Sequence, residues 1–267
     1  MRGILMPCVI TLTTDFGLRD PFVGIMKGVV LSICPSARLV DLTHEIAPQD
    51  ILAGSLALEA ATPFFPPGTV HLAVVDPGVG TARRAIAVRA GGAYLVGPDN
   101  GLFSFALEEA GWTAVSLTAP QYRLAEVSRT FHGRDIFAPA AAHLAAGVPL
   151  ERLGPAVSDP EHLRRPGCRL ADGELVGEVL DADRFGNLIT SIPAARLAEI
   201  PGAALVEVEV AGRRVRGPVG AYAEVREGEP AIIVGSTGRL EIFVRGGRAV
   251  DRLSAGRGTV VRVRRAG

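Results

Sequence analysis

The first 76 residues alternate between short apolar runs typical of buried strands and longer apolar runs typical of helices, and this alternation restricts the possible folds most. Strand-like runs at residues 8–16, 38–43 and 70–76 are separated by helix-like runs at 21–34 and 50–65. Strands that alternate with helices favour a parallel sheet with helices on its faces. We therefore expect an α/β fold with a mostly parallel central sheet in this part of the chain.

A proline-rich segment without periodicity, residues 153–170, precedes a change of pattern. The sequence beyond it contains short β-rich runs separated by glycine turns, as in ALVEVEVAGRRVRG and AIIVGSTGRLEIFV. Such runs predict a small antiparallel β-barrel. We expect an N-terminal α/β domain over residues 1–162 and a smaller C-terminal β-barrel domain over residues 168–267.

Charge and cysteine content argue against several classes of protein. The 267 residues include 28 basic and 28 acidic side chains, so no net charge attracts nucleic acid or an anionic membrane. The cysteines Cys8, Cys34 and Cys168 are odd in number and form no CxxC pair, which argues against a disulfide framework and a thiolate zinc site. No uncharged apolar run reaches the roughly 18 to 20 residues of a membrane-spanning helix, and the N-terminal segment lacks a signal-peptide cleavage site. We expect a soluble protein in the reducing cytoplasm, without nucleic-acid or membrane partners.

Two aspartates follow predicted buried strands, the place where open α/β sheets bind ligands. Asp15 follows the first strand, and one ionised carboxylate can accept hydrogen bonds from two neighbouring hydroxyls of a ligand. Asp76 follows the third strand, next to glycines that let a ligand approach the backbone, and Arg83 stands shortly after it. Asp76 and Arg83 are also consistent with a structural ion pair that closes this loop. Asp20 either binds a ligand or caps the helix predicted to begin at Pro21.

A histidine beside a glycine, immediately before a predicted helix, strengthens the functional interpretation of this acidic loop. His132 lies in the segment FHGRD, where Arg134 and Asp135 supply a second pair of opposite charges. Histidine titrates near neutral pH and can act as a general acid or base, whereas an isolated histidine more often makes a structural hydrogen bond. We expect His44 and His143 to be of the structural kind.

The only two asparagines of the chain, Asn100 and Asn187, stand in glycine-flanked loops after predicted strands. Turn chemistry explains both positions, because asparagine tolerates left-handed backbone and bonds its own main chain. Asn187 also has Asp183 and Phe185 beside it in the sequence and Tyr222 further along. Aromatic rings together with an amide that pairs with a base edge are what an adenine site requires. Both interpretations remain open for Asn187.

Glycine-rich segments of the chain do not match nucleotide-binding loops. In Gly78–Arg83 an arginine occupies the place of the third glycine of a dinucleotide fingerprint, and Lys27, the only lysine, lies in no P-loop pattern. The segment Val234–Ile242 combines glycines with the hydroxyl of Ser236. This segment is consistent with a carboxylate-binding turn and equally with a plain hairpin turn.

Seven segments, in this order and spacing, resemble the S-adenosyl-L-methionine (SAM) hydrolases that form adenosine, also called SAM hydroxide adenosyltransferases and related to fluorinase and chlorinase. They are TTDFG with the following Asp20, SICPSARLVDLTHEI, VVDPGVGT with RR, GPDNGL, FHGRDIFAPAAAHLA, DRFGNLIT and GSTGRLEI. The resemblance extends over nearly the whole chain. It implies a catalytic N-terminal α/β domain, a C-terminal β-barrel, and a homotrimer with active sites between neighbouring subunits. The implied reaction converts SAM and water to adenosine and L-methionine without a cofactor or metal.

The same resemblance implies roles for individual residues. The catalytic trio, by which we mean Asp76, Arg83 and His132, corresponds to the aspartate, arginine and histidine of the family motifs. The implied substrate contacts are Asp15 for the ribose hydroxyls, Asp20, Asp183 and Ser236 for the methionine part, and Phe185, Asn187 and Tyr222 for the adenine.

Differences from fluorinase bear on the choice of nucleophile. Asp76 stands where fluorinase has tyrosine, and His132 and Gly133 stand where it has tyrosine and serine. The resemblance thus implies a water-activating pocket in place of a halide pocket. Two positions depart from the family pattern: Thr237 stands where fluorinase has arginine, and Arg245 stands where relatives usually have asparagine near the adenine.

Three alternatives compete with a water-using SAM hydrolase. The first is a halide-using adenosyl transferase of the same fold. The second is a noncatalytic protein that binds adenosine or SAM. The third is a metal-dependent hydrolase whose ligands are Asp15, Asp20 and Asp76, for which insensitivity to chelators is the excluding observation.

Overall fold

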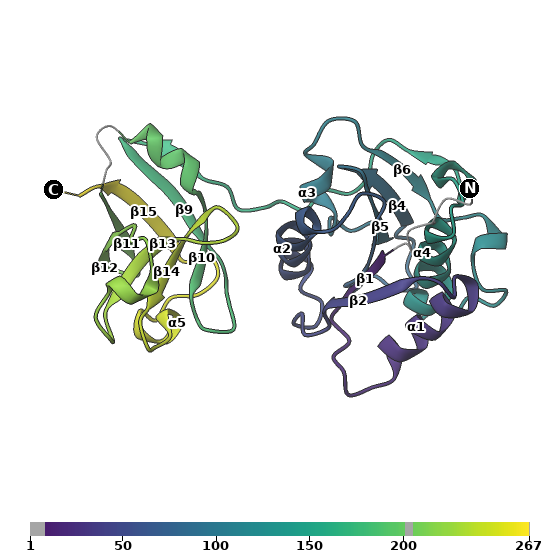
Figure 1. Ribbon diagram of the computed structural model, residues 1–267. Helices are drawn as coiled ribbons and strands as arrows, with labels where there is room; N and C mark the ends of the chain where they lie inside the picture. The colour runs from purple at the N-terminus through teal and green to yellow at the C-terminus, as the bar shows by residue number, and fades with distance from the viewer. Residues whose placement is uncertain (1–8, 201–204, 267) are drawn as a thin grey trace, which may run out of the picture. The chain divides into compact units, whose positions relative to one another are not determined.

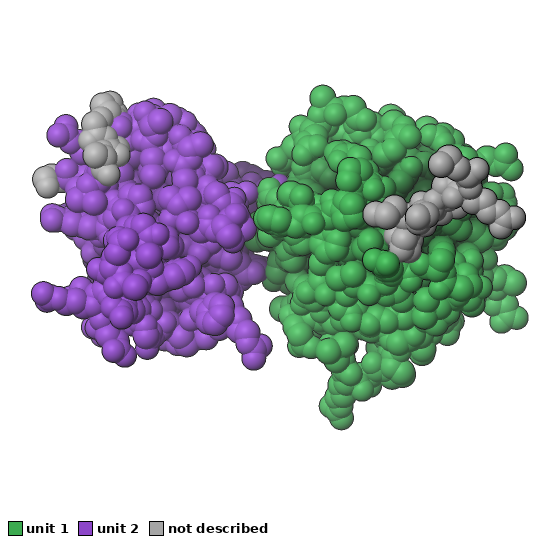
Figure 2. Space-filling view, viewed as in Figure 1, with its two compact units in different colours: residues 1–163 green, residues 164–267 purple. Residues whose placement is uncertain are grey.

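A computed structural model of the protein describes residues 9–200 and 205–266, and the chain forms two compact units, residues 1–163 and 164–267 (Figure 1, Figure 2). Each unit has its own hydrophobic core. Cys34 and Cys168 are free thiols, and Cys8 lies outside the described residues. No helix in the described ranges is long and apolar enough to cross a membrane.

The first unit is built on a sheet with the strand order β2-β1-β3-β5-β4-β6-β7 (Figure 1). The strands are β1 (Val9–Thr14), β2 (Arg38–Thr43), β3 (Val70–Val74), β4 (Ala85–Ala90), β5 (Ala93–Pro98), β6 (Thr113–Ser116) and β7 (Ala156–Val157). β1 pairs in parallel with β2 and β3, and β3 pairs in parallel with β5. β4 is antiparallel to both β5 and β6, and β6 is antiparallel to β7.

The sheet is therefore mixed, and the expectation of a mostly parallel sheet was wrong for its second half. The reason lies in the connection between β4 and β5, which is the two-residue turn Gly91–Gly92. Both glycines have positive φ, 56° and 82°, as the tightest hairpin turns require. A two-residue connection can join only antiparallel strands, because a parallel pair needs a crossover of a dozen or more residues.

Helices cover both faces of this sheet. They are α1 (Phe22–Ile33), α2 (Ile51–Ala61), α3 (Ser104–Leu107) and α4 (Ala138–Ala145), with a π-helical turn, η3 (Gly133–Phe137), directly before α4. Short 3₁₀ turns occur at η1 (Thr62–Phe64), η2 (Pro120–Tyr122) and η4 (Leu150–Arg152). α1 and α4 share one core with Leu72 and Val74, whereas α2 and α3 share another with Ala73 and Val75. Successive residues of β3 thus alternate between the two faces.

The second unit is an antiparallel sheet with the strand order β12-β11-β15-β9-β10-β14-β13, and β8 pairs with β9. Its strands are β8 (Arg169–Ala171), β9 (Glu174–Ala182), β10 (Leu188–Pro193), β11 (Val206–Val210), β12 (Arg213–Gly217), β13 (Pro230–Val234), β14 (Arg239–Val244) and β15 (Val260–Arg265). Short helical elements are η5 (Ala194–Glu199), η6 (Tyr222–Glu224) and α5 (Ala249–Arg252).

This sheet curls until its two outer strands nearly meet. Val219, just after β12, forms a bridge with Ile233 of β13, and its N–H donates to the carbonyl of Ile232 over 2.9 Å. The alternating valines of β11, such as Val208, point into the enclosed core with Val263 of β15. The second unit is accordingly a nearly closed, barrel-like antiparallel sheet, as the glycine-punctuated pattern predicts.

Candidate active site

The loop between β3 and β4 closes through a bidentate pair of charged side chains. The Nε of Arg83 donates to Oδ1 of Asp76 over 2.8 Å, and its Nη2 donates to Oδ2 of the same carboxylate. The two side chains are only 10% and 4% exposed. A buried arginine–carboxylate pair of this geometry combines charge with two directed bonds, so each group holds the other in one orientation. The ion pair foreseen from the sequence is present.

His132 completes the catalytic trio, since its Nδ1 lies 2.9 Å from Nη2 of Arg83. Arginine can only donate hydrogen bonds, so Nδ1 is the acceptor and a neutral His132 carries its proton on Nε2. Burial lowers the pKa of His132 below its ordinary value, the charge of Arg83 lowers it further, and Asp76 acts in the opposite direction. The structure thus assembles Asp76, Arg83 and an imidazole that, when neutral, carries its proton on Nε2.

The positions of two further residues explain how the trio is held. Gly80 has φ +77°, and a side chain there would collide with the carbonyl of Arg129, so glycine permits the Asp76 loop to lie against the segment before His132. The guanidinium carbon of Arg83 lies 5.2 Å from the ring centroid of Phe137, which is fully buried in the π-helical turn η3. This cation–π contact with a buried ring helps to hold the guanidinium in place.

The side chain of Asn100 forms hydrogen bonds with the backbone next to the trio. Its Nδ2 donates to the carbonyl of Val75 over 2.9 Å, and its Oδ1 accepts from the N–H of Leu102 over 3.2 Å. Val75 follows β3 and directly precedes Asp76, so this asparagine anchors the backbone where the loop that carries Asp76 starts. The turn interpretation is confirmed for Asn100.

The two N-terminal aspartates differ in their surroundings. Asp15 is half-buried at the end of β1, and its Oδ2 accepts a hydrogen bond from the N–H of Gln49 over 2.8 Å, which leaves Oδ1 without a hydrogen-bond donor in the part of the chain that the structure describes. Asp20 is exposed, and its predicted alternative as a helix cap was wrong. The N-cap of α1 is Pro21, and no side chain caps this helix. The helix begins one residue later than the proline suggested, because the carbonyl of Pro21 already accepts the first helical bond from Ile25.

An aromatic cluster links the Asp15 loop to the trio. The rings of Phe16, Phe22 and Phe131 meet edge to face, with centroid distances between 5.3 Å and 6.0 Å. Phe16 follows Asp15 and Phe131 precedes His132, so this cluster brings the two ends of the candidate site to the same edge of the sheet.

His44 is confirmed as a structural histidine. Its Nδ1 lies 2.8 Å from Oγ1 of Thr14, and its Nε2 lies 2.9 Å from Oδ1 of Asp41. Asp41 also accepts a hydrogen bond from Lys27 over 2.6 Å. Thr14 directly precedes Asp15, so this chain of polar groups supports the backbone at the end of β1.

A second cluster of predicted site residues belongs to the barrel-like unit. Both oxygens of Asp183 accept hydrogen bonds from Asn187, one from the backbone N–H and one from Nδ2, each over 2.9 Å. Asn187 is buried, whereas the ring of Phe185 between them is 75% exposed. The Asp183–Asn187 turn therefore presents an open aromatic face beside an ordered amide.

The remaining predicted residues of this unit lie in two loops. Tyr222 is half-exposed, and its ring packs edge to face on Phe243 with a centroid distance of 4.7 Å. Arg245 donates from Nη1 to the carbonyl of Val225 over 2.7 Å, so it holds the loop that carries Tyr222. Ser236 is exposed in the turn between β13 and β14.

Glu241 of β14 is a charged residue that sequence reasoning missed. Its side chain is buried, and burial followed by the charge of Asp183 raises its pKa. Burial also raises the pKa of Tyr222, and the negative charges of Glu241 and Asp183 raise it further. The charges of the two acids thus act on the tyrosine. The signal that could have revealed it is a lone acid inside the apolar run LEIFV.

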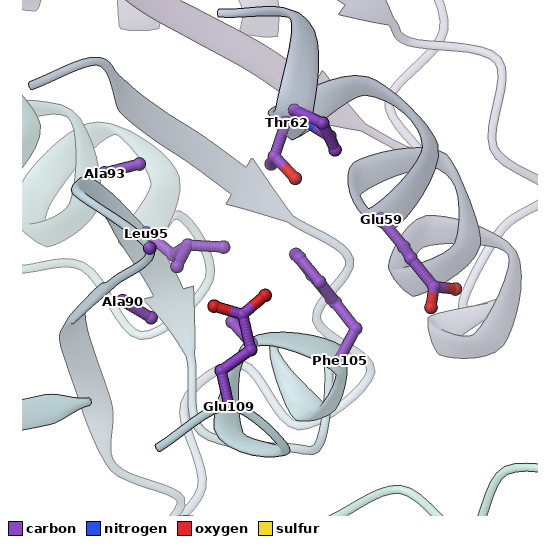
Figure 3. Close-up of a pocket in the computed structure, with 10 residues that line it drawn as sticks. Glu59, Thr62, Ala90, Ala93, Leu95, Phe105 and Glu109 are labelled. Carbon is purple, nitrogen blue, oxygen red and sulfur yellow. The ribbon is translucent and has the colours of Figure 1, made fainter. Parts of the chain in front are cut away.

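A cavity of about 390 Å³ lies in the first unit, away from the trio (Figure 3). Glu109 and Phe105 project towards it in Figure 3, and Leu95 forms part of its wall. It opens at the start of β5, next to the β4–β5 turn, whereas Asp76 follows the carboxyl end of β3, which runs parallel to β5. The cavity and the trio therefore lie at opposite ends of the sheet, and the cavity is not part of the candidate site.

Side-chain sets typical of metal centres are missing from the described ranges, since no three His, Cys, Asp or Glu residues there are grouped to hold an ion. The trio instead offers a fixed cation, a carboxylate and an imidazole N–H around one point. This arrangement can orient and polarise a small nucleophile such as water.

Comparison with known proteins gives concordant matches for both units. Residues 10–154 match the model of the SAM hydroxide adenosyltransferase N-terminal domain, and residues 177–262 match that of the C-terminal domain. The (R)-S-adenosyl-L-methionine hydrolase of Salinispora tropica is 45% identical over 259 residues, which are 95% of this chain and 97% of that protein. The fluorinase of an Actinoplanes species is 34% identical and covers 69% of this chain and 71% of its own.

A solved structure agrees with these matches. An uncharacterised conserved protein from Thermotoga maritima superimposes with a TM-score of 0.89 at 38% identity, covering 96% of this chain and all of its own. Matches of this extent include both units and the loops that carry the trio, and we conclude that the chain belongs to the SAM hydroxide adenosyltransferase family.

Proposed function

We propose that this protein hydrolyses S-adenosyl-L-methionine to adenosine and L-methionine. The observation that carries the proposal is the buried cluster of Asp76, Arg83 and His132 at the carboxyl edge of the sheet. Relatives at 45% and 46% identity over nearly their whole length are named (R)-S-adenosyl-L-methionine hydrolases. The function therefore has support both from chemistry and from close kinship.

The reaction requires a well-placed water more than a strong catalyst. The sulfonium of the substrate leaves as a neutral thioether, so no acid or metal is needed for its departure, and we propose that no cofactor takes part. The water oxygen forms a bond to C5′ while the bond between C5′ and sulfur breaks. The electron pair of the breaking bond stays with sulfur. One proton of the water must move to an acceptor.

The geometry of the trio favours Asp76 as that acceptor. Because Nδ1 of His132 accepts a hydrogen bond from Arg83, the other ring nitrogen, Nε2, carries the proton and can only donate. Its N–H can therefore orient a water molecule by donating a hydrogen bond to the water oxygen. Asp76 keeps lone pairs beyond its two bonds to Arg83, and Arg83 stabilises the charge on the hydroxide as it forms. In this mechanism, His132 positions the nucleophile and Asp76 receives its proton.

We propose substrate contacts from both units. Oδ1 of Asp15 suits the ribose hydroxyls, because a carboxylate oxygen accepts from a neighbouring diol. The open ring of Phe185 and the half-exposed ring of Tyr222 suit stacking on adenine. Asn187 would pair with the adenine edge, and Asp20, Asp183 and Ser236 would hold the methionine part.

The assembly that we propose is a cytoplasmic homotrimer with active sites between neighbouring subunits. Its support is the division of the site, because the trio belongs to the first unit and the adenine-binding candidates belong to the second. Under this proposal, neighbouring subunits bring these two groups of residues together. The proposed partner is the small-molecule substrate, without nucleic acid or membrane.

A halide-using transferase of the same fold remains the nearest rival, since fluorinases are also relatives. Asp76 and His132 argue against it, because a carboxylate at the nucleophile position repels a halide ion. The other rivals are a noncatalytic SAM-binding protein and a metal-dependent hydrolase that uses Asp15, Asp20 and Asp76.

One experiment separates these four functions. Purified protein is incubated with SAM in water enriched in oxygen-18, with and without chloride and with and without a chelator, and the products are identified by mass spectrometry. Adenosine that carries the heavy oxygen at the 5′ position, independent of chloride and chelator, supports the proposal. A halogenated adenosine, loss of activity with chelator, or bound but unchanged SAM would each establish one of the rivals instead.

A further inference from the structure

The segment FHGRD contains a pair of opposite charges that the proposed mechanism does not use. Asp135 is fully buried in the π-helical turn η3, whereas the side chain of its neighbour Arg134 is 37% exposed. Nε of Arg134 donates to Oδ1 of Asp135 over 2.6 Å, and Nη2 donates to Oδ2 over 3.1 Å. An ion pair of adjacent residues can form at the surface, where both charges keep their water, whereas burial of a carboxylate is costly. The burial of Asp135 therefore indicates a specific role for its carboxylate.

The carboxylate of Asp135 closes a ring of hydrogen bonds around the backbone of His132. Oδ2 of Asp135 accepts from the backbone N–H of Ser128 over 2.8 Å. Oγ of Ser128 accepts from the N–H of Phe131 over 3.1 Å, and the carbonyl of Phe131 accepts from the N–H of Asp135 over 3.2 Å. His132 lies between Phe131 and Asp135 in the chain, so this hydrogen-bonded ring fixes the backbone on both sides of it.

Arg134 connects the hydrogen-bonded ring to the aromatic cluster. Its guanidinium carbon lies 5.3 Å from the ring centroid of Phe131, while the same group pairs with Asp135. A planar guanidinium can contact an aromatic face and a carboxylate at the same time. Phe131 in turn packs edge to face on Phe16 and Phe22, so the backbone before His132 is also held by its neighbours in space.

The segment that Asp135 holds, residues 128–131, also lies against the loop of Asp76. The carbonyl of Arg129 occupies the space next to Gly80, so this segment and that loop are in contact. A shift of the segment would therefore move the imidazole of the trio relative to its carboxylate and its guanidinium.

We propose that Asp135 is a positioning residue that holds His132 with Nδ1 against Arg83. This inference rests on the proposed function, in which His132 orients the attacking water. Nδ1 lies 2.9 Å from Nη2 of Arg83, and a displacement of about 1 Å would break a hydrogen bond of this length. Misplacing a catalytic group by that distance lowers a rate by about 10²-fold. Because Asp135 is fully buried, it acts on the reaction only through the groups that it holds.

The test is the Asp135→Asn variant, which keeps the shape of the side chain. An amide has one oxygen, so in either orientation its NH₂ group faces a donor, the N–H of Ser128 or the guanidinium of Arg134. The substitution therefore breaks one of these contacts. We expect kcat for adenosine release to fall about 10- to 100-fold, with the dissociation constant for SAM within about threefold of the wild-type value.

NMR of the imidazole reports on the position of His132 directly. Nδ1 accepts from Arg83 in the wild type, so ¹H–¹⁵N spectra at about pH 8, where the ring is neutral, should show only the tautomer with its proton on Nε2. Asp135→Asn should show a mixture of both tautomers. The signals of His132 are identified by their absence from a His132→Gln variant.

Asp99→Asn is the matched control for the loss of a buried carboxylate. Asp99 accepts from Nε of Arg84 over 2.7 Å and from the backbone N–H of Glu161 over 2.8 Å, so it has the same kinds of partner as Asp135. Its replacement should cost comparable stability and leave both kcat and the tautomer of His132 unchanged.

Ser128→Ala opens the same hydrogen-bonded ring at a partly exposed position, so it tests the inference even if Asp135→Asn does not fold. It removes the oxygen that accepts from the N–H of Phe131, and kcat should fall about 3- to 10-fold.

A purely structural role of Asp135 gives a different result. If both variants kept kcat within about twofold of wild type and retained the single tautomer, the inference would be overturned while the proposed function stands. The same conclusion follows if Asp135→Asn loses no more activity than Asp99→Asn. A wild-type protein that does not hydrolyse SAM would overturn both the inference and the proposed function.

Discussion

Replacing Asp76 by asparagine separates the catalytic role of the trio from its structural role. The change keeps the shape of the side chain and one acceptor oxygen, so the 2.8 Å bond from Nε of Arg83 can persist. The second bond, from Nη2 of Arg83, is lost together with the negative charge. Arg83 is then a mostly buried cation without a paired negative charge in the trio, although it keeps its contacts with the carbonyl of Arg84, with His132 and with the Phe137 ring.

The expected loss of stability follows from these contacts. One hydrogen bond between charged groups is worth about 1.5 to 3 kcal/mol, and solvent can replace little of it because the side chains are 4% and 10% exposed. We therefore expect the free energy of unfolding of the first unit to fall by about 2 to 3 kcal/mol. For a unit of this size, that corresponds to a thermal midpoint lower by roughly 4 to 12 °C.

The expected loss of activity is larger than the loss of stability explains. Removing a proton acceptor that acts in the transition state should lower kcat by about 10² to 10⁴, while the dissociation constant for SAM changes little. The assay is adenosine release measured well below the midpoint of the variant, with calorimetric titration of SAM in parallel.

Asp99→Asn is the matched control for this experiment. Asp99 is also buried and also pairs with an arginine, since Nε of Arg84 donates to its Oδ2 over 2.7 Å. It lies outside the trio, so its replacement should cost comparable stability and leave kcat near the wild-type value. If Asp76→Asn retained kcat within about tenfold of wild type, Asp76 would be a structural residue and the proposed mechanism would be wrong.

Three other predictions follow from the same structure. In Arg83→Gln, the pKa of His132 should rise, because the charge of Arg83 lowers it in the wild type; NMR titration of the ring checks this, and an unchanged or lower pKa would contradict it. Gly80→Ala should destabilise the protein by about 1 to 3 kcal/mol, because φ is +77° and the carbonyl of Arg129 occupies the space; an unchanged denaturation midpoint would refute this. Burial of His71 lowers its pKa to about 4 from 6.5, so the unfolded state binds a proton that the native state does not, and about 3 kcal/mol of stability should be lost as pH falls from 6.5 to 4. Replacing His71 by glutamine should remove that part of the pH dependence of unfolding.

Local periodicity was enough to predict most elements of this fold. The strand predicted at 38–43 coincides with β2, the strand predicted at 70–76 contains β3, Val70–Val74, and the helix predicted at 21–34 is α1, Phe22–Ile33. The helix predicted at 50–65 is shorter, since α2 ends at Ala61 and the 3₁₀ turn η1, Thr62–Phe64, follows it. Apolar spacing encodes which face of an element is buried, and that property is local to the chain.

Contacts between residues that are far apart in the sequence decided the geometry of the candidate site and the direction of some strands. The sequence pointed to Asp76, Arg83 and His132 through position and family resemblance, but 49 residues separate Arg83 from His132, and only the folded chain shows which imidazole nitrogen faces the guanidinium. The direction of β4 depended on a two-glycine turn, and the exposure of Asp20 depended on where α1 begins.

Glu241 shows the difference most clearly. In the sequence it is one acid in an apolar strand, with no sign of what it meets. The tertiary structure places it against Gly235 and within electrostatic reach of Asp183, which is 58 positions earlier. The chain by itself determined which segments are strands, which are helices and where acids follow strands, because these depend on neighbours along the backbone. Which charges are paired and which are buried was decided only by tertiary structure, because electrostatic interaction depends on distance in space and on exclusion of water.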